Sequence, residues 1–154
     1  MTHQALAEFL VDAKRSTYAG LGDEATLTPL LVGSRQLEYR RAPWFYRDVY
    51  FGTAWFAGQE TVYRESSPVW AMGYAGGLLA APGVDGTEVY AFLRRALREV
   101  TPEDPYRGPR SFVDGDFAYS REHDGDVGRF NGIEVIHVRA RSVYELRYLG
   151  GLLR

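Results

Sequence analysis

The chain has 154 residues and a formal net charge of −2. This length is sufficient for one domain (residues 1–154) whose hydrophobic core is stable without disulfides or metal ions. An isoelectric point near 5.9 argues against direct nucleic-acid binding, and the absence of cysteine excludes disulfides, thiolate catalysis and cysteine-bound metals. No stretch approaches the roughly 20 apolar residues of a membrane span, and the N-terminus lacks a secretory pattern, so we expect a cytoplasmic protein that does not engage membranes.

The first half of the chain predicts one helix followed by four strands. Apolar residues at helical spacing predict a helix over residues 4–16, and Thr2 can cap its first turn. The glycines and the proline of residues 18–34 are typical of a long connection. Beyond it the apolar residues recur at every second position, which predicts strands at 35–41, 44–52, 55–64 and 68–75.

The second half predicts a helix followed by three strands. A loop at 76–86 leads to a helix at 87–100, whose start can be capped by Asp85 or Thr87. We expect strands at 112–120, 127–139 and 142–149, hairpin turns at 123–126 and 140–141, and a bulge or bend at Gly132. The fold class is therefore α+β: a strongly curved antiparallel sheet of about seven strands packed with two helices, in the order α-β4-α-β3.

Aromatic residues and two carboxylates share one parity of the predicted strands. Within residues 44–52, for example, Tyr46, Asp48 and Tyr50 lie on one face. If such faces converge, the sheet carries a concavity of rings, hydroxyl groups and a few carboxylates, which is typical of small-molecule pockets. We predict a ligand site lined by Tyr46, Asp48, Tyr50, Trp70, Tyr74, Arg107 and Tyr148. The alternative is a helix-covered core with the tyrosine hydroxyls at its rim.

The motif PYRGP at 105–109 has two prolines, which exclude a regular helix or an inner strand. In a structural interpretation, Tyr106 closes the end of the core and Gly108 permits close backbone approach. Arg107 then pairs with one of the nearby carboxylates Asp104, Asp114 or Asp116. In a functional interpretation, the stiff loop aims Arg107 into the mouth of the sheet as a receptor for an anion.

Complete catalytic and cofactor motifs are absent from the sequence. The DGD sequences at 114–116 and 124–126 lack the remainder of a calcium loop, and turn chemistry accounts for the second of them. The three histidines lack a metal-ligand spacing, and no GxSxG, P-loop or GxGxxG sequence occurs. The sequence therefore predicts no cofactor and no metal site.

Several stretches carry a resemblance to a known family. They are YRDVYFG and FAGQE within 46–60, PVWAMGYAG at 68–76, PYRGP at 105–109 and FVDGDFAY at 112–119. Together they resemble a bacterial family of uncharacterised domains, whose members look like stand-alone proteins or like the C-terminal part of transcription regulators behind a helix-turn-helix domain. The resemblance implies a sensor or an oligomerisation module, and it assigns no activity to any residue.

Three classes of function stay open. The leading hypothesis is a small-molecule-binding, sensor-like module, because the rings share a face with Asp48. The second is a protein-interaction or homodimerisation module, because exposed aromatic surfaces mark such interfaces. The third is an enzyme in which Asp48 or Glu60 acts as general base and Arg107 stabilises an anion.

Overall fold

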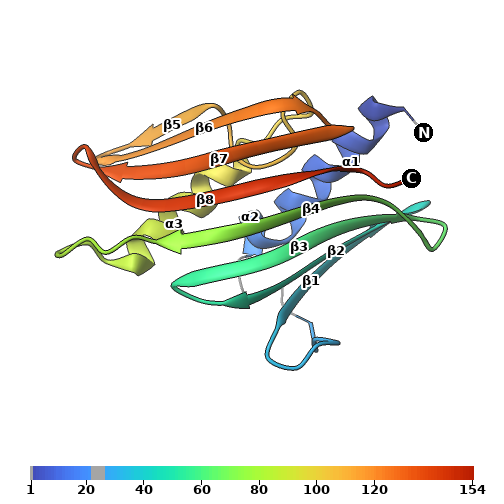
Figure 1. Cartoon of the computed structure of the whole chain (residues 1–154), viewed down its shortest axis with the longest axis horizontal. Helices are drawn as coiled ribbons and strands as arrows, with labels where there is room; N and C mark the ends of the chain where they lie inside the picture. Colours follow the sequence, from blue (N-terminus) through green and yellow to red (C-terminus); the bar gives the residue numbers. More distant parts are fainter. Residues whose placement is uncertain (1, 22–26) are drawn as a thin grey trace.

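A computed structural model describes residues 2–21 and 27–154, which form one open antiparallel sheet with helices on one of its faces (Figure 1). The strand order is β1-β2-β3-β4-β8-β7-β6-β5, so two four-stranded meanders meet where β4 pairs with β8. The strands are β1 (Arg35–Arg41), β2 (Trp44–Gly52), β3 (Trp55–Arg64), β4 (Ser67–Leu78), β5 (Ser111–Asp114), β6 (Phe117–Asp126), β7 (Arg129–Val138) and β8 (Arg141–Leu152). The helices are α1 (His3–Ser16), α2 (Tyr18–Leu21) and α3 (Gly86–Arg98).

The strands of the first half confirm the prediction. β1, β2 and β3 begin and end at the expected residues, and β4 continues to Leu78, three residues beyond the expected end. The register also confirms the expected faces, because Asp48 lies directly opposite Glu60, and Glu60 lies opposite Met72. The alternation of apolar side chains was therefore sufficient to place this half of the sheet.

The second half corrects four predictions, of which three concern residues 112–139. The described residues form eight strands and not seven, because a turn at Gly115, with φ of +61°, divides the strand expected at 112–120. The hairpin turn expected at 123–126 is wrong, because these residues belong to β6 and pair with β7. The chain reverses at 127–128. Gly132 lies in regular register, and the irregularity of β7 falls instead between Ile136 and His137.

The last hairpin turn also lies one residue earlier than expected. Arg139 and Ala140 both adopt positive φ, 48° and 65°, as a two-residue turn between twisted strands requires. The turn was expected at 140–141, but the strand register places Arg141 inside β8 opposite Val138.

The two long helices begin at the expected caps. The Thr2 side chain accepts a hydrogen bond from the Ala5 amide, and Asp85 accepts one from Thr87 at 2.8 Å. α2 is a short helix that the sequence prediction missed within its connection at 18–34, of which residues 22–26 lie outside the described part. Within the described chain, no helix has the length and apolar character that crossing a membrane requires.

Arginine side chains join α1 to α3 above the sheet. The Arg15 guanidinium donates to the carbonyl oxygens of Arg98 and Val100 at 3.1 and 2.7 Å. The Arg98 guanidinium in turn donates to the carbonyl oxygen of Ala19 at 2.7 Å. The last carbonyl groups of a helix have no partner within the helix, so these bonds satisfy groups that would otherwise need water. The helices are consequently held as a layer over the inner face, where most of the core lies.

Candidate functional site

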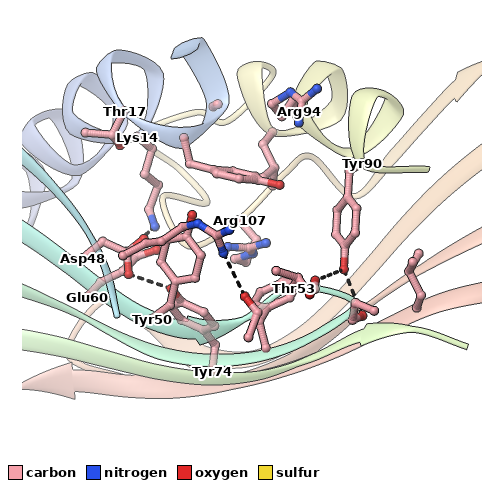
Figure 2. A pocket seen from close by; sticks show the side chains of 18 of the residues that line it. Lys14, Thr17, Asp48, Tyr50, Thr53, Glu60, Tyr74, Tyr90, Arg94 and Arg107 are labelled. Carbon is pink, nitrogen blue, oxygen red and sulfur yellow. Dashed lines mark hydrogen bonds and ion pairs between the residues drawn. The ribbon is translucent and has the colours of Figure 1, made fainter. Parts of the chain in front are cut away.

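A cavity of about 520 Å³ lies between the inner face of the sheet and the helices (Figure 2). Its sheet side comes from β1, β2, β3 and β4, its helix side from all three helices, and one end from the PYRGP loop that follows α3. This volume lies within the range of about 300–1,000 Å³ that is typical of small-molecule sites. The sequence prediction of a concavity on the aromatic face therefore corresponds to a hollow in the structure.

Five of the seven predicted site residues line this cavity: Tyr46, Asp48, Tyr50, Tyr74 and Arg107. The three from β2 point inward because they alternate with exposed or half-buried neighbours, and Tyr74 lies on the same face of β4. The structure therefore brings together residues that lie up to 61 positions apart, from Tyr46 to Arg107.

Trp70 and Tyr148 do not line the cavity. Trp70 has the expected parity but lies four residues before Tyr74, about 13 Å along β4, where its ring stacks on Phe130 at 5.7 Å. Its indole nitrogen donates to the Val127 carbonyl oxygen at 3.0 Å. Tyr148 packs between Phe130 and Tyr106 in the core. Alternation along a strand predicts which face of the sheet a side chain lies on. It does not predict whether that side chain lies beside the cavity or elsewhere along the strand.

Asp48 is the carboxylate at the centre of the site. The Tyr74 hydroxyl donates to its Oδ1 at 2.6 Å, and its other carboxylate oxygen forms no hydrogen bond with any residue that the structure describes. The side chain is buried, and Glu60 lies directly opposite it on β3. Burial and the charge of Glu60 raise the pKa of Asp48 to about 7, although the Tyr74 hydrogen bond and two nearby cations oppose the rise.

Glu60 is held by Lys14, a residue that the sequence prediction missed. The Lys14 ammonium reaches down from α1 to the Glu60 carboxylate (Figure 2), with which the Tyr46 hydroxyl also interacts. Burial lowers the pKa of Lys14, and the Glu60 charge partly offsets that effect. A signal was available, because Lys14 lies four residues after the buried Leu10 and therefore on the core-facing side of α1.

Arg107 has a different partner from those predicted. Its Nε and Nη2 donate to the two oxygens of Glu134 at 3.1 and 2.7 Å, and the hydroxyls of Tyr119 and Tyr144 donate to the same carboxylate. Glu134 is fully buried and Arg107 is 8% exposed, so the pair lies in the interior and not at a mouth. The remaining terminal nitrogen, Nη1, makes no hydrogen bond within the described chain, and the guanidinium lines the cavity.

The three carboxylates expected near Arg107 form other ion pairs. Each pairs with a different arginine at 2.7–2.9 Å: Asp104 with Arg121, Asp114 with Arg95, and Asp116 with Arg139. Glu134 could have been noticed, because the two-residue alternation of β7 places it on the same face as the buried Phe130 and Ile136. Its distance from Arg107 in the sequence hid the pairing.

The rest of the PYRGP motif follows the structural interpretation. Tyr106 is 2% exposed, and the centre of its ring lies 4.3 Å from the centre of the Phe130 ring. Gly108 permits the expected close approach, because a Cβ there would lie 2.8 Å from the ring of Tyr119, whose hydroxyl accepts a hydrogen bond from the Gly108 amide. The loop therefore holds Arg107 rigidly between Glu134 and the cavity.

The opposite end of the cavity is formed by α3 and the β2–β3 turn. The Tyr90 hydroxyl lies 2.9 and 3.0 Å from the carbonyl oxygens of Thr53 and Ala54, so it donates its hydrogen to one of them (Figure 2). Arg94, also from α3, is half-buried and makes no hydrogen bond or ion pair with the described residues. In the described chain no three histidines or carboxylates gather in a way that could hold a metal ion.

Comparison with known proteins identifies a family but no characterised relative. A family model, Domain of unknown function (DUF5680), matches residues 48–153. No curated protein and no solved structure matches the chain. The matched segment begins at Asp48 and includes Glu60, Tyr74, Arg107 and Glu134, whereas α1 lies before it. Because the match covers more than half of the chain, as the resemblance of its motifs led us to expect, this protein belongs to the DUF5680 family of uncharacterised domains.

Proposed function

We propose that this protein binds a small organic molecule in the cavity between its sheet and its helices, as a sensor-like module. The observation that carries the proposal is that two buried side chains lining the cavity each have a polar atom without a hydrogen-bond partner among the described residues. These atoms are the second carboxylate oxygen of Asp48 and the Nη1 of Arg107. Polar atoms of buried side chains are normally hydrogen-bonded, so a ligand in the cavity would supply the partners that the described residues do not.

The composition of the walls supports the same proposal. Rings from β2, β3, β4 and α3 provide apolar surface, and a small number of charged groups would orient the ligand. This combination of apolar walls with few directed polar groups is that of small-molecule sites in general. The ion pairs behind the walls hold the orienting groups in place, so little order would have to be created on binding.

The construction of the cavity also suits a sensor. Its walls belong partly to the sheet and partly to α1, α2 and α3. A ligand that contacts both layers would stabilise their present arrangement, since binding shifts a protein toward the state that it contacts best. Occupancy would thus be communicated to the helices, whose outer surfaces are available to a partner.

The test combines a thermal-shift screen with chemical-shift mapping. A library of small cationic, anionic and neutral compounds is screened for an increase in Tm, because a ligand that binds the native state alone raises stability. Each hit is then added to ¹⁵N-labelled protein. We expect amide shifts to concentrate in residues 46–60 and 86–97, with residues of the outer face such as Val113 as the internal control. A screen without hits, or hits that perturb the outer face instead, would overturn the proposal.

A further inference from the structure

Five buried ionisable side chains lie at the inner end of the cavity or directly behind its wall, and three of them are carboxylates whereas two are cations. Lys14 is paired with Glu60, and Arg107 is paired with Glu134. Asp48 is the fifth group, and it accepts a hydrogen bond from an uncharged tyrosine hydroxyl. An ionised carboxylate that is buried without a cationic partner is costly, so it must be either protonated or neutralised from outside.

The groups that face Asp48 come from every element packed against it. Glu60 lies opposite it on β3, Tyr74 beside it on β4, Lys14 above it on α1, and Arg107 at the loop after α3. Both cations are paired with other carboxylates, and burial together with the charge of Glu60 outweighs their attraction for Asp48. Asp48 lines the cavity, and its second oxygen has no hydrogen-bond partner among the described residues.

Two further arginines line the cavity away from this end. Arg35, opposite Tyr50 on β1, donates to the carbonyl oxygen of Gly52 at 3.1 Å, and its guanidinium carbon lies 6.0 Å from the centre of the Tyr50 ring. Arg94 extends from α3 on the helix side (Figure 2). They would meet the far part of a bound molecule and not the group that contacts Asp48.

Aromatic rings line the cavity from Asp48 toward its opposite end, beginning with Tyr74, whose hydroxyl is bonded to Asp48. The ring of Phe56 contacts those of Tyr50, Tyr74 and Tyr90, with centroids 6.3, 6.0 and 6.2 Å away. The faces of such rings carry partial negative charge and attract cations, most strongly where water is excluded. The rings and the carboxylate therefore favour the same sign of charge.

We propose that the ligand is an organic ammonium ion, in which a protonated amine donates to the free oxygen of Asp48 and an apolar or aromatic body lies among Tyr50, Phe56 and Tyr90. The inference rests on the proposed function and adds the chemical class of the ligand. A cation at this point makes the charges of the five buried groups balance. An anion there would lie close to the carboxylates of Asp48 and Glu60, and Arg107 is already neutralised by Glu134.

Binding of an ammonium ion should depend on pH in a defined direction. The pKa of Asp48 is about 7 in the free protein, so about a tenth of the molecules have it ionised at pH 6 and about nine tenths at pH 8. An ammonium ion prefers the ionised form. Its affinity should therefore increase about tenfold from pH 6 to pH 8, as long as the amine itself stays protonated.

The experiment uses three probes of one shape and different charge: 2-phenylethylamine, 2-phenylethanol and 3-phenylpropionate. Their Kd values are measured by NMR titration of the full chain at pH 6 and pH 8. We expect the amine to bind at least tenfold more tightly than the other two at pH 8, and its shifts to map to the cavity. Tighter binding of the carboxylate or the alcohol overturns the ammonium assignment but leaves the proposed function standing. If none of the three binds in the cavity, the ammonium assignment also falls, whereas the proposed function is decided by the wider library.

Two matched variants test the role of Asp48 itself. Asp48→Asn keeps the shape and an acceptor for Tyr74, and we expect it to weaken amine binding at least tenfold at pH 8 and to abolish the pH dependence. Asp116→Asn makes the same chemical change in an exposed ion pair with Arg139, outside the cavity, and should bind like the wild type. Equal amine affinity in Asp48→Asn and the wild type would overturn the proposal.

Discussion

Replacement of Arg107 by methionine tests the buried ion pair that ties the PYRGP loop to the sheet. The sequence alone is compatible with an exposed pair on a turn, for which a loss of about 0–1 kcal/mol is typical. In the structure, Arg107 donates twice to Glu134, which is fully buried. Its removal leaves that carboxylate with two tyrosine hydroxyls and no cation. Removal of one partner of a buried ion pair costs about 3–5 kcal/mol, and we expect a loss of that size from Arg107→Met.

The magnitude is large relative to the total stability of a small domain, about 5–15 kcal/mol, so the variant should remain foldable and measurable. The free energy of unfolding is obtained from urea denaturation followed by tryptophan fluorescence and circular dichroism. Glu134→Gln should also be strongly destabilising, because it leaves the Arg107 charge buried without its counter-ion. The double variant should lose clearly less than the sum of the two single losses, since the two residues form one unit.

A control distinguishes burial from the mere presence of an ion pair. Arg139 donates to Asp116 at 2.7 Å, as short as the contact of Arg107 with Glu134, but these side chains are 80% and 56% exposed. Arg139→Met should therefore lose about 0–1 kcal/mol. A loss below about 1 kcal/mol in Arg107→Met, or additive losses in the double variant, would refute the conclusion that the pair is a buried structural unit.

The packing and the buried carboxylate of Asp48 give three more expectations. Tyr106→Ala should lose about 3–5 kcal/mol in urea denaturation because it truncates a ring that is 2% exposed, and a loss below about 1 kcal/mol would contradict its place in the core. Gly132→Ala should cost about 1–3 kcal/mol because its Cβ would lie 2.4 Å from the ring of Tyr148, whereas Gly73→Ala, with nothing within 4 Å, should be nearly neutral. The pKa of Asp48 is about 7 in the folded chain against 3.8 as the ordinary value, so folding stability should fall as pH rises from about 4 to 7, by up to about 4 kcal/mol. Denaturation at several pH values should show that Asp48→Asn removes this slope, and a wild type without any slope would contradict the assignment.

Much of the site could be anticipated because strand alternation is a local property. Side chains two apart on a strand share a face, so the sequence of β2 by itself places Tyr46, Asp48 and Tyr50 together. The stiffness of PYRGP was likewise readable from its prolines. What could not be anticipated was where along each strand the helices leave a hollow, which is why Trp70 and Tyr148 were grouped with the others.

Turn positions were less readable than strands because several nearby residues could each form the turn. Gly115 and Gly125 both follow an aspartate and both adopt positive φ, yet the first lies at a hairpin turn and the second within the paired ladder of β6. The choice depends on the register that the neighbouring strands impose, since a slip by one residue would expose the whole buried face.

The sequence by itself determined the α+β class, the order of the long elements, the parity of the aromatic residues and the rigidity of the loop around Arg107. These follow from periodicity and backbone restriction, which act over a few residues. The tertiary structure alone decided the charge partners: Lys14 with Glu60, 46 positions apart, and Arg107 with Glu134, 27 positions apart. Ion pairs form between groups that the packed elements bring within contact distance, and no local pattern encodes that distance. For the same reason, only the tertiary structure shows that Asp48 lies beside the cavity without an ion-pair partner among the described residues.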